Sequence, residues 1–355
     1  MKVFGQVVFL LLFIVCGVAF GQTSSSTTSG NFTNAGTSGA LILKMPVGAR
    51  AAAMGGAFVG MSGDITSVFW NPAGVASLKG QQADFEYSSS FGNISHSFLA
   101  GSIPISDEYT LAASLVSLST GSIPLTTLLD QNGTSGATFS ASDLVLGLTF
   151  AGNLTDKFSF GITGKYVRTG FYNLYASGLA FDVGTLYRTD FYGMTFGINI
   201  ANLGTEEQYS GSGLLFPLTV NDPQSGNPLP SAQYPTVNAT LPTNQFSLPL
   251  LFRAGASIDL LGQVAGVKDQ KLNVAADFVT YSDYPETVQL GAEYWWEDLV
   301  AVRAGYEFFN NVYNFSAGVG LRYETGTFIG TINYAFQNTV NLGGINNIGV
   351  SLNFK

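Results

Sequence analysis

Most of this chain alternates between apolar and polar residues with a period of two, and this pattern constrains the fold more than any other feature. From Phe315 to Tyr323, every odd position is apolar and every even position is Gly, Ser or Arg. From Leu144 to Phe150, every even position is Leu or Phe. Strict alternation of this length predicts a strand with one apolar face. Gly, Ser and Thr on the opposite face are typical of a transmembrane barrel.

Segments of this kind occur about fourteen times by the alternation rule. They lie near 82–89, 94–104, 109–117, 143–151, 157–168, 175–188, 194–203, 248–260, 271–281, 287–297, 299–309, 314–324, 327–337 and 347–355. Bacterial single-chain barrels require an even number of strands. The predicted fold class is therefore all-β, a transmembrane outer-membrane β-barrel of about fourteen antiparallel strands.

The lengths of the connections fit this strand count. If both termini face the periplasm, the connections that leave odd-numbered strands lie outside the cell. The two long connections, near 118–142 and 204–247, both fall there, whereas short turns such as Glu297-Asp298 fall on the periplasmic side. Long external loops and short periplasmic turns are the expected asymmetry.

Composition favours a lipid environment over the alternatives of a secreted β-sandwich or propeller. Charged residues make up 10% of the chain, against about 25% in soluble domains. Aromatic residues reach 13% and gather at the predicted strand ends, as in interfacial belts. The expected surroundings are outer-membrane lipids. A net charge of -9 argues against a nucleic-acid partner, whose phosphates call for a basic surface.

The N-terminus predicts export. An apolar run from Val7 to Phe20 follows Lys2, and it is shorter than the roughly 20 residues of a spanning helix. Small residues before Gln22 predict signal cleavage there, which gives a signal peptide over residues 1–21. A lipoprotein interpretation would use Cys16, but the bulky Val15 fits a lipobox poorly. Residues 22–39, rich in Ser, Thr, Gly and Asn, are predicted to be a flexible tether.

Residues 40–80 predict a small helical or turn plug ahead of the barrel at 81–355. The alanine run at 51–53 favours a short helix, and the following glycines allow close packing against another surface. Asn71 precedes a proline and is therefore pushed out of the helical region. The candidate plug motif is Gly55, Gly56, Asp64, Asn71, Pro72 and Ala73. Its expected main role is to pack inside the barrel and close it.

Charged residues on the predicted inner face lie on five consecutive strands. They are Arg253, Asp277, Glu293, Arg303, Glu307 and Arg322. Because both signs are present, they can pair with one another instead of standing alone. The pattern fits either a salt-bridged scaffold that fills the barrel or a docking wall for the plug, with Arg50 as a contact.

The sequence predicts no enzyme, no catalytic residue, no cofactor and no metal site. His96 is the only histidine, and Cys16, the only cysteine, leaves with the signal peptide. A Cys-His pair and the usual zinc clusters are therefore ruled out by composition. We interpret His96 as lying on the edge of an aromatic belt.

The plug segment also carries a family resemblance. Gly48 to Gly60, then Gly63-Asp64, then Trp70-Asn-Pro-Ala-Gly74 resemble the N-terminal signature of the PorV/PorQ family of outer-membrane proteins. That family is related in architecture to FadL-type transporters. The resemblance implies a type IX secretion accessory that associates with the large translocon barrel and with cargo bearing a C-terminal signal domain.

Under that interpretation the two long external connections carry recognition. The second is apolar and rich in proline, and exposed apolar segments usually mark contact sites. Its candidate partner or ligand residues are Leu214, Leu215, Phe216, Pro217 and Phe246, together with Pro235, Leu241 and Pro242.

The alternative function is FadL-like uptake of hydrophobic small molecules. The plug would then gate a route from the external loops into the wall or lumen. Apolar loop residues would serve this function too, as the first contact for an apolar ligand.

Overall fold

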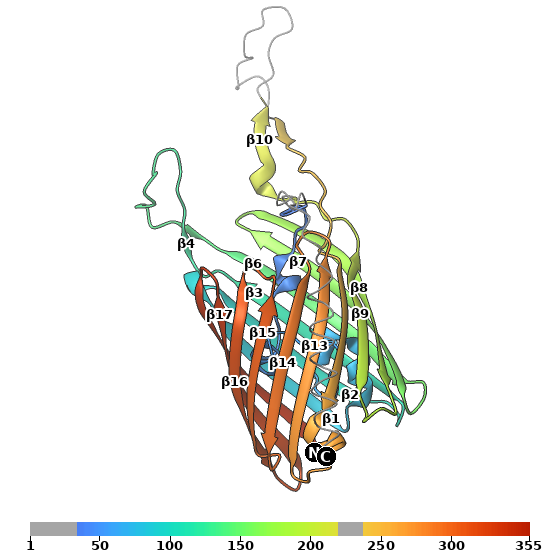
Figure 1. Cartoon of the computed structure of the whole chain (residues 1–355). Coiled ribbons are helices and arrows are strands. Elements are labelled where there is room, and N and C mark those ends of the chain that lie inside the picture. The colour runs from blue at the N-terminus through green and yellow to red at the C-terminus, as the bar shows by residue number, and fades with distance from the viewer. Residues whose placement is uncertain (1–33, 219–236) are drawn as a thin grey trace, which may run out of the picture.

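The structure is a computed structural model that describes residues 34–218 and 237–355, in which fourteen antiparallel strands form one closed barrel (Figure 1). The predicted fold class is confirmed. The barrel strands follow chain order around the wall, and β1 pairs with β18 to close it. Their bounds are β1 Gln81–Ser89, β2 Ser95–Pro104, β3 Tyr109–Ser119, β6 Ala141–Asn153, β7 Phe158–Phe171, β8 Leu174–Arg188, β9 Thr195–Gly204, β12 Leu251–Asp259, β13 Gln270–Tyr281, β14 Thr287–Trp296, β15 Val300–Phe308, β16 Tyr313–Glu324, β17 Phe328–Thr339 and β18 Gly343–Phe354.

The predicted signal peptide, the first part of the predicted tether and Pro235 lie outside the described residues. Short helices occur in three connections, as η3 Phe91–Asn93, η4 Ser212–Leu214 and η5 Leu260–Val264. None of the helices in the described ranges is long and apolar enough to cross a membrane.

Both long connections form hairpins at the same end of the barrel (Figure 1). One pairs β4 (Ile123–Pro124) with β5 (Thr138–Phe139), and the other pairs β10 (Leu215–Leu218) with β11 (Val237–Thr240). The opposite end carries short turns and the C-terminus (Figure 1). In outer-membrane barrels the short turns face the periplasm, so we call this the periplasmic end and the other the extracellular end.

Alternation along each strand separates an apolar outer face from a polar inner face. On β6, the outward Leu146 and Leu148 expose 42% and 72% of their surface, whereas the inward Thr149 exposes 1%. On β17, Ile332 is exposed and Asn333 is buried. Lipid can cover such an apolar outer band, which explains the low charge content of the chain.

Four short elements fill the inside of the barrel: η1 (Leu41–Lys44), α2 (Ala49–Ala53), α3 (Ser67–Trp70) and η2 (Pro72–Ser77). We call residues 40–80 the plug. Ser38 pairs with Ser247 in an external connection, and Gly80 lies against Asn353 and Phe354 at the periplasmic end. The plug therefore runs through the barrel from the extracellular to the periplasmic end.

Candidate functional site

Asn71 joins the plug to the barrel wall. Its backbone leaves α3 in an extended conformation, with φ −158°, and Pro72 begins η2. Its side-chain Nδ2 donates to the carbonyl oxygens of Val59 at 2.9 Å and of Thr185 on β8 at 3.0 Å. Its Oδ1 accepts from the backbone N–H of Ala73 at 3.2 Å. One fully buried amide thus fixes two parts of the plug and one wall strand.

Three glycines of the barrel wall lie directly against the Asn71-Pro72-Ala73 turn of the plug. Gly161, Gly184 and Gly197 lie on the neighbouring strands β7, β8 and β9. A Cβ at Gly161 would come within 2.5 Å of the Ala73 backbone nitrogen, and Cβ atoms at the other two would overlap Asn71 Oδ1 and Val59 O. We call these three glycines the glycine seat. Only residues without a side chain let the plug backbone come this close to the wall.

Gly55 and Gly56 turn the chain after α2. Both have positive φ, at 63° and 76°, which L-residues with side chains rarely adopt. A Cβ at Gly55 would lie 2.8 Å from the backbone nitrogen of Tyr306, and one at Gly56 would lie 2.8 Å from Gln289 Nε2. The plug therefore packs tightly on the opposite wall as well.

Arg50 ties the plug to the wall by charge. It binds Glu293 through two hydrogen bonds, of 2.8 Å and 2.7 Å, and Arg303 binds the same carboxylate at 2.7 Å. Arg50 also lies 3.2 Å from Asp64, which caps Thr66 at 2.9 Å. Arginine stays protonated in proteins, so Arg50 is charged, and its pair with Glu293 is buried and compensated.

Two of the remaining inner charges, Asp277 and Arg253, contact the plug, as in the docking-wall alternative. Asp277 accepts the backbone N–H groups of Phe58 and Val59, at 2.6 Å and 2.8 Å. Arg253 lies over the rings of Phe69 and Trp70, with centroid distances of 5.5 Å and 5.4 Å. Both residues hold the plug instead of each other. Arg322 lies at the periplasmic end, 3.6 Å from Asp298, and Glu307 accepts from Gln289 and Asn310 at 3.3 Å and 2.8 Å.

Sequence reasoning missed a buried pair on β7 and β8. Lys165 Nζ lies 2.5 Å from Asp182 and 3.0 Å from Asn202 Oδ1. The pair sits where the β8–β9 register shifts, between Phe181 and Val183. The alternation along each strand predicts that both charged side chains point inward. Only the pairing register between the strands places them next to each other.

His96 faces the barrel interior and exposes 4% of its surface. Our interpretation of His96 as a member of the outer aromatic belt was therefore wrong, because β2 points it inward. Across the described ranges, no group of three His, Cys, Asp or Glu residues is placed to hold a metal ion.

The first external connection ends in an ordered turn with two fully exposed leucines. Asp130 accepts hydrogen bonds from the backbone nitrogens of Thr134 at 2.9 Å and of Ser135 at 2.7 Å. These backbone hydrogen bonds lower the pKa of Asp130. Beside it, Leu128 and Leu129 expose 93% and 101% of their surface.

In the second external connection, only some of the apolar residues predicted to contact a partner or ligand are exposed. Leu215 and Leu241 expose 48% and 54% of their surface, while Leu214 and Phe216 are half-buried, and Pro217 lies on β10. Phe246 is held at the base, where its ring lies 5.2 Å from that of Tyr209. Beside it, burial, followed by the charge of Asp143, raises the pKa of Glu207 to about 7.

Several solved barrels share this fold. The CymD monoaromatic hydrocarbon channel matches with a TM-score of 0.56 and 13% identity, over 87% of this chain and 96% of that one. The Pseudomonas putida toluene transporter TodX matches with a TM-score of 0.55 and 14% identity, over 87% and 97%. The Ralstonia pickettii toluene transporter TbuX gives 0.52 and 14%, over 87% and 97%. At such identities the similarity establishes the fold alone. No curated protein matches the chain.

The sequence model of type IX secretion system protein PorV matches residues 29–213. The match covers more than half of the 355 residues, including the whole plug and the first seven barrel strands. The closed barrel and the family match together make this an outer-membrane protein, and the chain belongs to the PorV family.

Proposed function

We propose that this protein is a type IX secretion accessory that binds the translocon barrel or its cargo through its extracellular connections. The observation that carries the proposal is the pair of leucines at the tip of the β4–β5 connection. Leu128 and Leu129 are almost fully exposed, on a turn that Asp130 holds through two backbone hydrogen bonds. Exposed apolar residues on a fixed turn suit the apolar groove of a protein partner.

The second external connection adds exposed apolar residues to the proposed contact surface. Its β10–β11 hairpin projects from the same end of the barrel (Figure 1), and it carries the exposed Leu215 and Leu241. Two apolar loops at one end offer a partner a composite contact, with the base held by Phe246 and Tyr209. Recognition residues are commonly placed on loops above a rigid scaffold.

FadL-like uptake of hydrophobic molecules is the alternative, and the solved barrels of similar fold are hydrocarbon channels. An apolar cavity inside this barrel, lined by residues such as Ile42, Phe98 and Val116, has a volume of about 10 Å³. That is about the space of one water molecule. The tight seat of the plug also favours a closed barrel over an open route. We therefore favour the secretion role.

Export is part of the proposal. We expect cleavage of the signal peptide before Gln22, which N-terminal sequencing of the mature protein would test. The remaining tether then precedes the plug.

The function is tested by purification from native outer membranes in mild detergent, with analysis of both bound proteins and bound lipids. We expect a very large barrel and proteins that share a C-terminal domain to co-purify. The double substitution Leu128→Ser with Leu129→Ser should abolish this association. Leu154→Ser is the matched control, because Leu154 is 58% exposed in a turn at the periplasmic end. Heat-modifiable migration in gels confirms that each variant is folded.

A lone barrel carrying fatty acids or hydrocarbons would instead support uptake. Retention of the protein partners by the double variant would show that the leucine tip is not the contact.

A further inference from the structure

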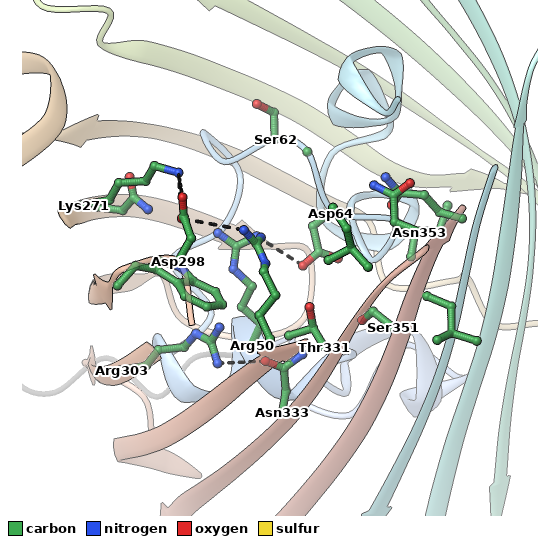
Figure 2. A pocket seen from close by; sticks show the side chains of 18 residues that line it. Arg50, Ser62, Asp64, Lys271, Asp298, Arg303, Thr331, Asn333, Ser351 and Asn353 are labelled. Atoms are coloured by element: carbon green, nitrogen blue, oxygen red, sulfur yellow. Dashed lines mark hydrogen bonds and ion pairs between the residues drawn. The ribbon is translucent and has the colours of Figure 1, made fainter. Parts of the chain in front are cut away.

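A polar cavity of about 240 Å³ opens between the plug and the wall at the periplasmic end (Figure 2). Residues at strand ends next to the short turns line it, such as Gln82 on β1, Lys271 on β13 and Asn353 on β18. The plug contributes Arg50, Ser62 and Asp64. The proposed extracellular function makes no use of this site.

Cationic side chains outnumber carboxylates in the lining. The four cations are Arg50, Lys271, Arg303 and Arg322, and the two carboxylates are Asp64 and Asp298. Both carboxylates already have partners: Asp64 accepts from Thr66 and Arg50, and Asp298 accepts from Lys271 at 2.8 Å and 3.1 Å. Glu293, Asp84 and Glu86 lie behind the lining and are not lining residues. They accept from Arg50, from Ser351 and from the backbone N–H of Ala49 respectively.

Two arginines of the lining have donors without acceptors. Arg303 is 1% exposed and uses Nε for Glu293 and Nη1 for Asn333, at 2.7 Å and 2.9 Å. Its Nη2 has no hydrogen-bond partner, and the same holds for Arg322 Nε. Both guanidinium groups lie over the ring of Trp295, with centroid distances of 5.4 Å and 4.8 Å. Stacking on one ring holds both groups at the cavity without satisfying these N–H groups.

A buried N–H group without an acceptor is uncommon and calls for a partner. Guanidinium groups prefer oxyanions, which they bind through parallel, charge-assisted hydrogen bonds. Neutral donors lie around the same space, from Ser62, Asn273 and Thr331. The volume suits a small group and is below the range of about 300–1,000 Å³ that is typical of larger organic ligands.

We propose that this cavity binds a small oxyanion from the periplasm, a phosphate or carboxylate group, through Arg322 and Arg303. Arg322 is the entry residue, since its side chain is 34% exposed at the rim. Arg303 forms the buried wall of the site. Lys271 adds positive charge at the opening.

The test is calorimetric titration of the full protein in nanodiscs with inorganic phosphate, and separately with acetate, at constant ionic strength set by chloride. We expect saturable binding, and Arg322→Gln should weaken it by about tenfold through loss of a charge-assisted pair. Arg322→Lys keeps the positive charge but loses the planar guanidinium group, which can donate two parallel hydrogen bonds to one anion. The affinity of this variant should therefore be intermediate.

Arg168→Gln is the matched control. Arg168 also lies over an aromatic ring, 5.2 Å from the centroid of Tyr175, but it is near the extracellular end of β7, so its loss should leave binding unchanged. Binding of phosphate alone identifies the group as a phosphate, and binding of acetate alone identifies it as a carboxylate. No saturable binding of either anion, or equal affinity in Arg322→Gln and wild type, would overturn the proposal.

Discussion

At the scale of single residues, buried polar side chains hold the plug through hydrogen bonds to backbone groups. Asn71 satisfies two carbonyl oxygens and one N–H group, and Asp277 satisfies two N–H groups. Trp70 Nε1 donates to Val47 O at 2.8 Å. The plug also supplies much of the buried apolar core, including Ile42, Met54 and Phe58. The polar side chains satisfy backbone groups that its short helices leave unpaired.

Asn71→Ala should destabilise the folded barrel by about 1–3 kcal/mol, because the buried carbonyl oxygens of Val59 and Thr185 lose their donor. Asn71→Asp should be more harmful, since a carboxylate cannot donate to those oxygens and brings a buried charge. The temperature at which the fast-migrating folded band disappears from gels measures both effects. Asn132→Ala, at an exposed loop position, is the control and should match wild type. An Asn71→Ala variant as stable as wild type would contradict the role assigned to this amide.

At the scale of elements, glycines on the wall decide how the plug fits. The glycine seat lies on three adjacent strands, β7 to β9, and admits the Asn71-Pro72-Ala73 turn. Gly305 and Gly318, on β15 and β16, lie similarly close to Met54 and Ala53. Glycine in a strand interior usually weakens the strand, and here it marks the close approach of another backbone.

Gly161→Ala should destabilise the plug by about 1–3 kcal/mol through overpacking. Gly164→Ala is a matched control on the same strand, because Gly164 faces outward and its nearest neighbour, a Phe181 ring atom, would lie 3.7 Å from the new Cβ. Protease access to the plug in purified protein should rise only in the first variant. Equal protection in both variants would show that the seat tolerates a side chain.

At the scale of the whole molecule, the protein is a barrel closed by its own N-terminal segment. The Arg50–Glu293–Arg303 cluster connects the plug with β14 and β15 across more than 240 positions of sequence, since the Arg50–Glu293 separation is 243. Two polar cavities lie on either side of Arg50 at the periplasmic end, with volumes of about 240 Å³ and 330 Å³. Function is therefore expected at the two ends of the molecule and not along its axis.

Glu293→Gln should destabilise the protein by about 3–5 kcal/mol, because it leaves two buried guanidinium groups without their shared carboxylate. In planar bilayers we also expect a rise in ion conductance as the plug loosens. Glu324→Gln breaks an exposed pair with Lys355, so it should change neither property. Unchanged stability and conductance in Glu293→Gln would show that the plug is held without this cluster.

The sequence alone determined the barrel, its strand count and the placement of both long connections at one end, because a period of two is a local property of each strand. It also placed Arg253, Asp277, Glu293 and Arg303 on the inner face. Tertiary structure alone decided what these residues contact, because the plug and the register bring together positions far apart in the chain. The exposed Leu128–Leu129 tip, the Lys165–Asp182 pair and the cavity around Arg322 depend on such non-local placement, and alternation within one strand carries no signal for them.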